Sequence, residues 1–394
     1  MDNTKRLFVA SFVTLIVAGI GFAIRGAILG DLGTQFGFTK TDLGTITGGG
    51  LVGFGLVILL ASAVADRVGY GKLLAVAFGL HIASVIVTGS ATPIYGDGSG
   101  GNANAYWALY VGMFMFAIGN GIVEAVINPL TATLYPEERT HYLNVLHAGW
   151  PAGLIIGGVF AFAFASSNAA LTQVRWEILI GLYMIPTLIY GTMLYRAHFP
   201  VSDAAAAGVA VKSMLKEFAA PMLLFLLLLH AMVGYVELGT DSWIVNIMQN
   251  VIEGQAFLLF IYTSALMFVL RFFAGPIVHR INPLGLLFVS SLVATAGLLM
   301  LGSSATGITI IIAATVYGAG KTFFFSGKSR LSLSLNVSEQ QLGKSPLEVE
   351  WSIDGGQKRA PRTTRVATNG EQSFPWFFPQ GVDTEVQVLS LIHI

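Results

Sequence analysis

The residues best suited to chemistry in this chain lie inside an apolar stretch. The segment GNGIVEAVINP, residues 119–129, follows an almost wholly apolar run at 106–118. Gly121, Glu124 and Asn128 are spaced i, i+3 and i+7, so they share one face of a helix. A charged carboxylate that faced lipid at this depth would cost several kcal/mol, so Glu124 must face a bundle interior or a water-filled cavity. We therefore predict a proton site at Glu124; a structural ion pair or a permanently neutral acid is the alternative.

Polar residues on neighbouring segments extend this candidate site. Asn128 precedes Pro129, so its amide either contacts a substrate or satisfies the carbonyl that the proline frees. Asn144 and His147 share a face early in a later apolar run. We predict a substrate contact at Asn144. His147 is either a second proton carrier or a hydrogen-bonded packing residue.

Arg25 is the most conspicuous cation in the first half of the chain, because no carboxylate lies close to it in sequence. It must find a partner across the bundle, such as Glu124 or Glu237, or bind an anionic or hydroxyl-rich ligand through its planar fork of donors. A salt bridge that only holds helices together is the alternative.

The second half carries its own polar group. Glu237 and Asp241 are spaced i, i+4, and Trp243 lies close by. These residues either form an outer gate and bind substrate hydroxyls, or lie near enough to an exit to be solvated. Arg271 and Lys321 add cations, although Arg271 can also snorkel to the membrane surface.

The composition sets the context for these residues. Of the 394 residues, 54% are hydrophobic and only 11% are charged, with a mean hydropathy of +0.72; soluble domains carry about 25% charged residues. The absence of cysteine excludes disulfides, thiolate metal sites and thiol nucleophiles. We find no nucleotide-binding loop, no metal-ligand spacing and no basic patch for nucleic acid. The sequence therefore predicts a lipid-embedded protein that is not an enzyme and has no cofactor.

The apolar runs predict helices that cross a bilayer. A crossing needs about 20 apolar residues, and ten runs approach or exceed that length: 7–30, 43–65, 72–93, 105–134, 141–167, 174–196, 216–245, 254–279, 284–302 and 305–325. Lysine and arginine gather on the side that holds the N-terminus, which indicates a cytoplasmic N-terminus.

An internal repeat divides these helices into two similar halves. Residues 62–74 and 275–287 share a small first residue, an arginine and closing leucines, and GNG at 119–121 matches GAG at 318–320. A repeat spaced by six helices is typical of secondary transporters, with the site between the halves. The domain boundaries that we predict are 1–196 for a six-helix bundle, 197–215 for a cytoplasmic linker, 216–325 for a second bundle with four helices, and 326–394 for a polar tail.

The tail breaks the pattern. After Phe325 no apolar run is long enough to span a membrane, and the last six residues, LSLIHI, match one reading frame of a common sequencing adapter. We expect residues 326–394 to be non-native and not to pack as an eleventh and twelfth helix. A genuine cytoplasmic extension is the alternative.

Two sets of motifs resemble a known family. ADRVGYGK at 65–72 resembles the loop motif of the major facilitator superfamily, which joins the second and third helices with Asp66, Arg67, Gly69 and Lys72 at matching positions. Within that superfamily, the segments 119–129, 143–144 and 235–244 resemble the fucose-permease-like sugar:proton symporters.

The resemblance implies an all-α membrane protein with the major facilitator fold, in which the second of two six-helix halves is incomplete. It implies alternating access in a bacterial-type inner membrane, with a monomer that moves a small polar solute, such as a sugar, together with protons. Glu124 and His147 would couple protons, and the substrate would contact Arg25, Asn128, Asn144, Glu237, Asp241 and Trp243. The alternatives are an organic-anion exchanger, a uniporter, and a membrane-embedded sensor or enzyme.

Overall fold

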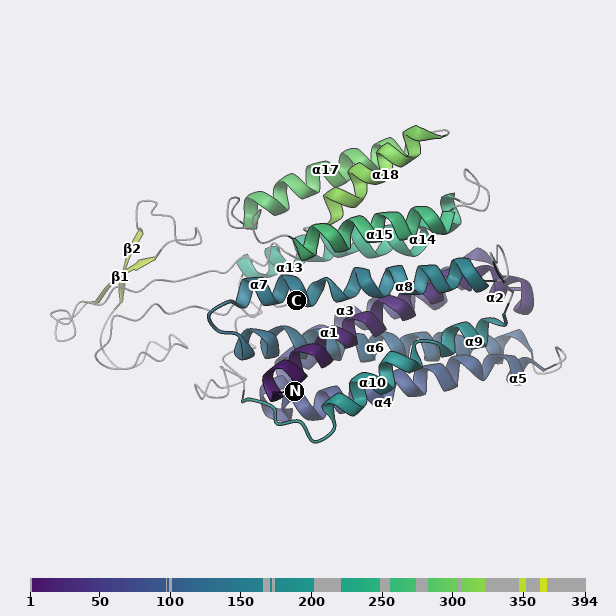
Figure 1. Ribbon diagram of the computed structural model, residues 1–394, viewed down its shortest axis with the longest axis horizontal. Coiled ribbons are helices and arrows are strands. Elements are labelled where there is room, and N and C mark those ends of the chain that lie inside the picture. Colours follow the sequence, from purple (N-terminus) through teal and green to yellow (C-terminus); the bar gives the residue numbers. More distant parts are fainter. Residues whose placement is uncertain are drawn as a thin grey trace.

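The structure is a bundle of long helices that run side by side (Figure 1). The computed structural model describes residues 2–96, 98, 101–165, 171, 174–201, 221–248, 256–273, 283–303, 307–322, 347–351 and 362–366. Within these residues the chain is helical apart from turns, connecting segments and two short strands, β1 (Leu347–Trp351) and β2 (Arg362–Val366). The strands pair antiparallel, with Leu347 opposite Val366. The predicted all-α membrane fold is confirmed.

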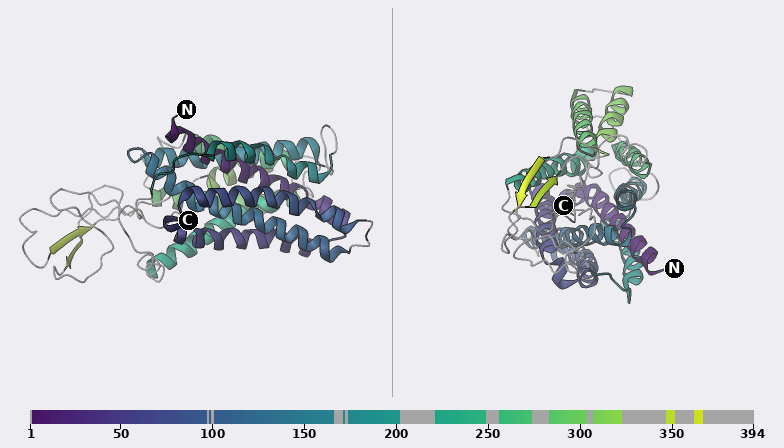
Figure 2. Two further views of the ribbon diagram at one scale, coloured as in Figure 1. Left: turned by 90° about the horizontal axis from the view of Figure 1, so that it is seen from below. Right: turned by 90° about the vertical axis from the view of Figure 1, so that its left-hand side faces the viewer.

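The first part of the chain forms one group of helices, seen end-on in Figure 2. Its elements are α1 (Asn3–Ala27), α2 (Leu29–Phe36), α3 (Lys40–Val68), α4 (Tyr70–Gly89), α5 (Ala91–Tyr95), α6 (Asn102–Leu134), α7 (Arg139–His147), α8 (Gly149–Phe164), α9 (Trp176–Gly181) and α10 (Met184–Leu194). A capping box starts α3, because the Thr39 hydroxyl accepts from the backbone of Asp42 while the Asp42 carboxylate accepts from the backbone of Thr39. We call α1 to α10 the N-terminal half.

The second group lies along one side of the first. It comprises α13 (Pro221–Gly234), the π-helical turn η1 (Tyr235–Gly239), α14 (Thr240–Met248), α15 (Ala256–Phe272), α17 (Pro283–Ser303) and α18 (Ile308–Lys321). These elements are the C-terminal half. The segment α13–η1–α14 is continuous, so the wider turn at η1 rotates Glu237 within an otherwise regular helix.

The described helices fit a membrane by length and composition. Seven are long and apolar enough to cross one: Asn3–Ala27, Lys40–Val68, Tyr70–Tyr95, Asn102–Leu134, His141–Phe164, Trp176–Leu194 and Gly285–Ser303. Two shorter apolar helices are Ala256–Phe272 and Ile308–Lys321. Each predicted span overlaps one of these segments or α13–η1–α14, and the parts of these spans at 166–167, 216–220, 254–255, 274–279, 305–306 and 323–325 lie outside the described residues. Most of the predicted linker and of the polar tail lies outside the described residues.

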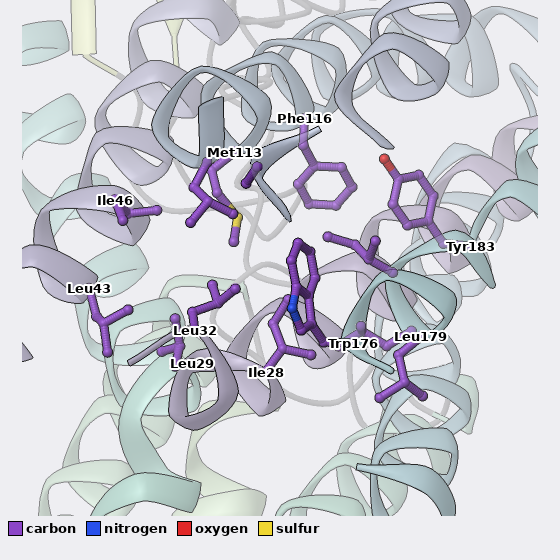
Figure 3. Close-up of a cluster of buried hydrophobic side chains, with 14 of the residues drawn as sticks. Ile28, Leu29, Leu32, Leu43, Ile46, Met113, Phe116, Trp176, Leu179 and Tyr183 are labelled. Atoms are coloured by element: carbon purple, nitrogen blue, oxygen red, sulfur yellow. The ribbon is translucent and has the colours of Figure 1, made fainter. Parts of the chain in front are cut away.

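Helix packing in the N-terminal half depends on small residues. A Cβ atom on Gly19 of α1 would lie 2.8 Å from the Cα of Gly153 on α8, so the two backbones touch. A cluster of buried apolar side chains in the same half includes Ile28, Leu32, Phe116 and Trp176 (Figure 3). A different cluster joins the halves, because Ala23 of α1 and Leu154 of α8 belong to it together with apolar residues of α14, α15, α17 and α18.

The two glycine pairs of the repeat occupy comparable places. Gly119 packs against α4 and Gly121 against α3, whereas Gly320 packs against α17 and Gly318 against α15. Each pair therefore lies between the two helices that precede its own. The two pairs differ in which glycine contacts the helix that is nearer in sequence. In GNG the first glycine, Gly119, contacts that helix, whereas in GAG the second glycine, Gly320, does. The ungapped match of GNG with GAG is therefore out of register.

Candidate functional site

A hydrogen-bonded chain begins at Glu124 on α6. The Asn128 side-chain amide donates to Glu124 Oε2 at 2.9 Å and to the Glu124 backbone carbonyl at 2.9 Å. Pro129 has no amide hydrogen and therefore frees the carbonyl of Ala125, not that of Glu124. The alternative that the Asn128 amide satisfies the carbonyl freed by the proline is therefore wrong. His147 Nε2 lies 2.8 Å from Asn128 Oδ1. Because Oδ1 can only accept, this arrangement requires the proton of His147 on Nε2.

The chain continues from the N-terminal half into the C-terminal half at Arg271. Arg271 Nη1 donates to the backbone carbonyl of His147 at 3.5 Å, and Nη2 lies 3.4 Å from Glu237 Oε1. Arg271 Nε donates to the Thr322 carbonyl at 2.7 Å. The Arg271 and Glu237 side chains are each 1% exposed. The alternative that Arg271 extends to the membrane surface is therefore wrong, because its side chain is enclosed between the halves.

A second buried ion pair lies beside the first. Lys321 Nζ donates to both carboxylate oxygens of Asp241, at 2.6 and 2.8 Å, and both side chains are fully buried. Lys321 also lies 5.2 Å from the centroid of the Tyr317 ring. The alternative that Glu237 and Asp241 are solvated near an exit is wrong. Each carboxylate has a buried cation beside it, which offsets the cost of removing both charges from water.

Arg25 takes a different position from the one predicted. Its guanidinium lies 3.7 Å from the Phe116 ring centroid and donates through Nη2 to Ser84 Oγ at 2.8 Å and to the Tyr183 hydroxyl at 3.2 Å. Figure 3 shows Phe116 and Tyr183 at the edge of the apolar cluster. Within the described residues no carboxylate pairs with Arg25, so the predicted partners Glu124 and Glu237 are wrong. Aromatic faces and hydroxyl dipoles hold the cation instead.

His81 was not among the predicted site residues, although it contacts three other members of this network, Tyr183, Tyr190 and Asn120. His81 Nδ1 lies 2.9 Å from the Tyr190 hydroxyl and Nε2 lies 3.0 Å from Asn120 Oδ1. The Tyr183 hydroxyl donates to the His81 carbonyl at 2.8 Å. The sequence signal that could have pointed to this network was its member Asn120, a buried polar residue one helical turn before Glu124 on α6.

The remaining predicted substrate residues are Asn144 and Trp243. Asn144 is buried in α7, one turn before His147. Trp243 is half-buried on α14, where a Cβ atom on Gly44 of α3 would lie 3.7 Å from its ring. Trp243 therefore contacts the opposite half near the ends of α3 and α14.

The loop motif lies where α3 ends and α4 begins. Gly69 adopts φ 87°, a conformation that only glycine accepts without strain, and its amide donates to Ala65 O at 2.8 Å. Arg67 and Lys72 are exposed, and Asp66 is half-buried. Among the described residues, no group of three histidine or acidic side chains could hold a metal ion.

Comparison with solved structures gives the same fold at low sequence identity. The xylose transporter XylE from E. coli, in a partially occluded inward-open conformation, has a TM-score of 0.61 and 16% identity over 83% of this chain and 86% of that chain. The transporter FucP, in the outward conformation, has a TM-score of 0.56 and 20% identity over 80% of this chain and 84% of that chain. The nucleoside transporter NupG has a TM-score of 0.56 and 12% identity over 83% of this chain and 81% of that chain.

A search of curated protein sequences gives no match. The family model described as Major Facilitator Superfamily matches residues 11–338, which is most of the chain. This match agrees with the helical bundle, the loop motif and the solved structures. The chain is therefore an integral, multi-pass membrane transporter rather than an enzyme, and it belongs to the Major Facilitator Superfamily.

Proposed function

We propose that this transporter is a proton-coupled symporter for a sugar or a similar small polar solute. The observation that carries the proposal is the chain of contacts from Glu124 through Asn128 and His147 to Arg271 and Glu237. It begins at a half-buried carboxylate in one half and ends at a buried carboxylate in the other. A change of protonation at Glu124 therefore has a direct route to the contact between the halves.

The proposed coupling follows from hydrogen-bond chemistry. A charged Glu124 accepts a strong, charge-assisted bond from the Asn128 amide, and this orients Asn128 Oδ1 toward His147. Protonation removes the charge and weakens that bond. His147 is then held less firmly, and its carbonyl is one of the groups that bind Arg271. Proton loading thus loosens the contact on which rocking of the two halves depends.

The substrate class has independent but weaker support. Solved structures with a similar fold include a D-xylose–proton symporter and the proton:xylose symporter XylE bound to 6-bromo-6-deoxy-D-glucose. At 16% and 17% identity these likenesses establish the fold alone, so the solute is part of the proposal. Asn128, Asn144 and Trp243 remain proposed substrate contacts.

Organic-anion exchange is the second candidate, and one observation favours it. Arg25 is a buried cation with no carboxylate partner in the described part of the chain. A substrate carboxylate would neutralise it. Its enclosure by Phe116, Ser84 and Tyr183 within the N-terminal half makes this the weaker alternative.

The proposed location is a bacterial-type inner membrane with a cytoplasmic N-terminus. Lys5 and Arg6 near the start of α1, Arg67 at the end of α3 and Arg139 at the start of α7 belong to the same end of the bundle. The opposite end, with α2, α5 and α9 (Figure 1), has fewer basic residues. The positive-inside rule assigns the first end to the cytoplasm.

Uptake by reconstituted vesicles tests the proposed function. Vesicles with an imposed inward proton gradient are expected to accumulate a labelled sugar from a panel of pentoses and hexoses above its outside concentration. An uncoupler is expected to abolish the accumulation. Equilibration without accumulation would indicate a uniporter, and accumulation that depends on an internal organic anion would indicate an exchanger.

A further inference from the structure

Three buried polar atoms near the contact between the halves make no hydrogen bond within the described residues. They are Trp150 Nε1 on α8, Ser264 Oγ on α15 and Glu237 Oε2 on η1. Ser264 and Glu237 are 0% and 1% exposed. Folded proteins rarely leave such groups unpaired, because each loses its bonds to water and gains nothing in return. Thr88 Oγ1 is equally buried without a hydrogen bond but lies inside the N-terminal half, so it is the position of these three atoms where the halves meet that points to a ligand.

The helix contacts place Trp150 and Ser264 close together. The α7–α8 segment contacts α15 at two places along its length. The His147 carbonyl contacts Arg271, and further along the chain a Cβ atom on Gly158 would lie 2.8 Å from Ile261, which precedes Arg271. The α7–α8 segment and α15 therefore run antiparallel. Between these two places, Trp150 and Ser264 lie about one helical turn apart, which is ~6 Å along the axis.

Both side chains belong to helix faces that meet. Trp150 is three residues after His147, and the helix continues through Ala148 in the right-handed conformation. Ser264 is seven residues before Arg271, so it shares the helix face that meets His147 and Glu237. The N-terminal half thus contributes Trp150 Nε1, and the C-terminal half contributes Ser264 Oγ and Glu237 Oε2, which belongs to the carboxylate that Arg271 contacts.

The chemistry of the three atoms defines the ligand that suits them. Trp150 Nε1 can only donate, Ser264 Oγ can donate or accept, and a carboxylate oxygen of Glu237 can only accept. A ligand must therefore accept at one end and donate at the other, as the hydroxyl groups of a sugar do. A ligand carboxylate cannot donate to Glu237 and is repelled by its charge. The buried cations of the C-terminal half do not change this, since Arg271 and Lys321 already pair with Glu237 and Asp241.

We propose that Trp150, Ser264 and Glu237 form a specificity subsite for a neutral polyhydroxyl solute, selecting against its carboxylate-bearing analogue. The inference rests on the proposed function and narrows its substrate class. Arg25 contributes nothing to this subsite, because Phe116, Ser84 and Tyr183 surround its guanidinium inside the N-terminal half.

The test is equilibrium binding to the purified full chain in detergent, without a gradient. The probes are D-xylose, D-glucose and D-glucuronate, of which the last two differ only in a carboxylate at C6. We expect at least one neutral sugar to bind at least tenfold more tightly than the uronate. Tighter binding of D-glucuronate, or no binding of either neutral sugar, would overturn the subsite.

Three variants locate the binding. Trp150→Phe keeps an aromatic ring but removes the indole donor, and Ser264→Ala removes the hydroxyl. Each is expected to weaken binding of the neutral sugar about tenfold. Thr88→Val is the matched control, because Thr88 Oγ1 is also buried without a hydrogen bond but lies between α4 and α6. Wild-type affinity in both Trp150→Phe and Ser264→Ala, with unchanged thermal unfolding, would also overturn the subsite.

This binding assay separates the subsite from proton coupling. If a neutral sugar binds as expected but vesicles do not accumulate it on a proton gradient, the subsite stands and the proposed symport fails. If D-glucuronate binds preferentially and is accumulated on a proton gradient, the coupling stands and the subsite fails.

Discussion

The two halves hold their buried cations in different ways. In the C-terminal half, Arg271 and Lys321 each lie beside a carboxylate, at 3.4 Å and 2.6 Å. In the N-terminal half, Arg25 is held by an aromatic face and by hydroxyl groups, without a carboxylate in the described residues. An ion pair changes its energy strongly when one partner gains or loses a proton, whereas ring and hydroxyl contacts keep theirs.

This difference suggests a division of labour. The Arg25 network, with Ser84, Tyr183 and His81, fixes α1, α4, α6 and the α9–α10 segment relative to one another. The ion pairs of the C-terminal half can respond to protons and ligands. Arg271 connects these ion pairs to the Glu124–Asn128–His147 chain of the N-terminal half, because it binds both Glu237 and the carbonyl of His147.

Removal of one charge from the Asp241–Lys321 pair has the largest expected effect on stability. Lys321→Met leaves Asp241 buried beside no compensating cation, so the free energy of unfolding should fall by about 3–5 kcal/mol. Thermal unfolding in detergent measures the loss. The double variant Asp241→Leu/Lys321→Met should recover most of it, since it removes both buried charges. A double variant no more stable than Lys321→Met would show that the pair contributes mainly through packing.

Arg25 offers the corresponding change in the N-terminal half, with a smaller expected loss. Arg25→Met removes the stacking on Phe116 and the bonds to Ser84 and Tyr183 but leaves no unpaired charge. We expect the free energy of unfolding to fall by about 2 kcal/mol. Binding of the neutral sugar should be retained.

Arg25→Lys is the matched control for charge. A lysine keeps the charge but not the planar fork, so it should not restore the stability. A stable Arg25→Met protein that no longer binds solute would show that Arg25 is a substrate residue and would remove the contrast between the halves.

Tyr190→Phe is the mildest test of the N-terminal network. It removes only the hydrogen bond to His81 Nδ1 and keeps the ring against Phe78. The expected loss is about 1 kcal/mol, the value of one neutral hydrogen bond. Thermal unfolding and uptake should be compared in the same preparation. Loss of proton-driven uptake at unchanged stability would place the His81 network in the coupling mechanism.

The sequence predicted the fold well because helices that cross a membrane are local features. Long apolar runs gave each span, and the loop motif with Asp66 and Gly69 gave the family. Helical spacing also placed Glu124 and Asn128 on one face, and the structure joins them by a hydrogen bond.

The pairing of charges across the bundle was beyond prediction from spacing alone. Lys321 and Asp241 are separated by eighty positions in sequence, and Arg271 and Glu237 by thirty-four. Arg25 was given the wrong partners because Ser84 and Tyr183, which lie on distant helices, carry no charge to mark them. Which helices meet is decided by packing of their small and apolar faces, and that information is not local.

Glu124→Gln provides the most direct test of proton coupling. Glutamine keeps the size of the side chain and an oxygen that accepts from Asn128, but it cannot lose a proton. In vesicles with a labelled sugar, the account predicts that Glu124→Gln retains binding and counterflow exchange but no longer accumulates sugar on an imposed proton gradient. Accumulation at the wild-type level would contradict the account and would move the coupling site to His147 or Glu237.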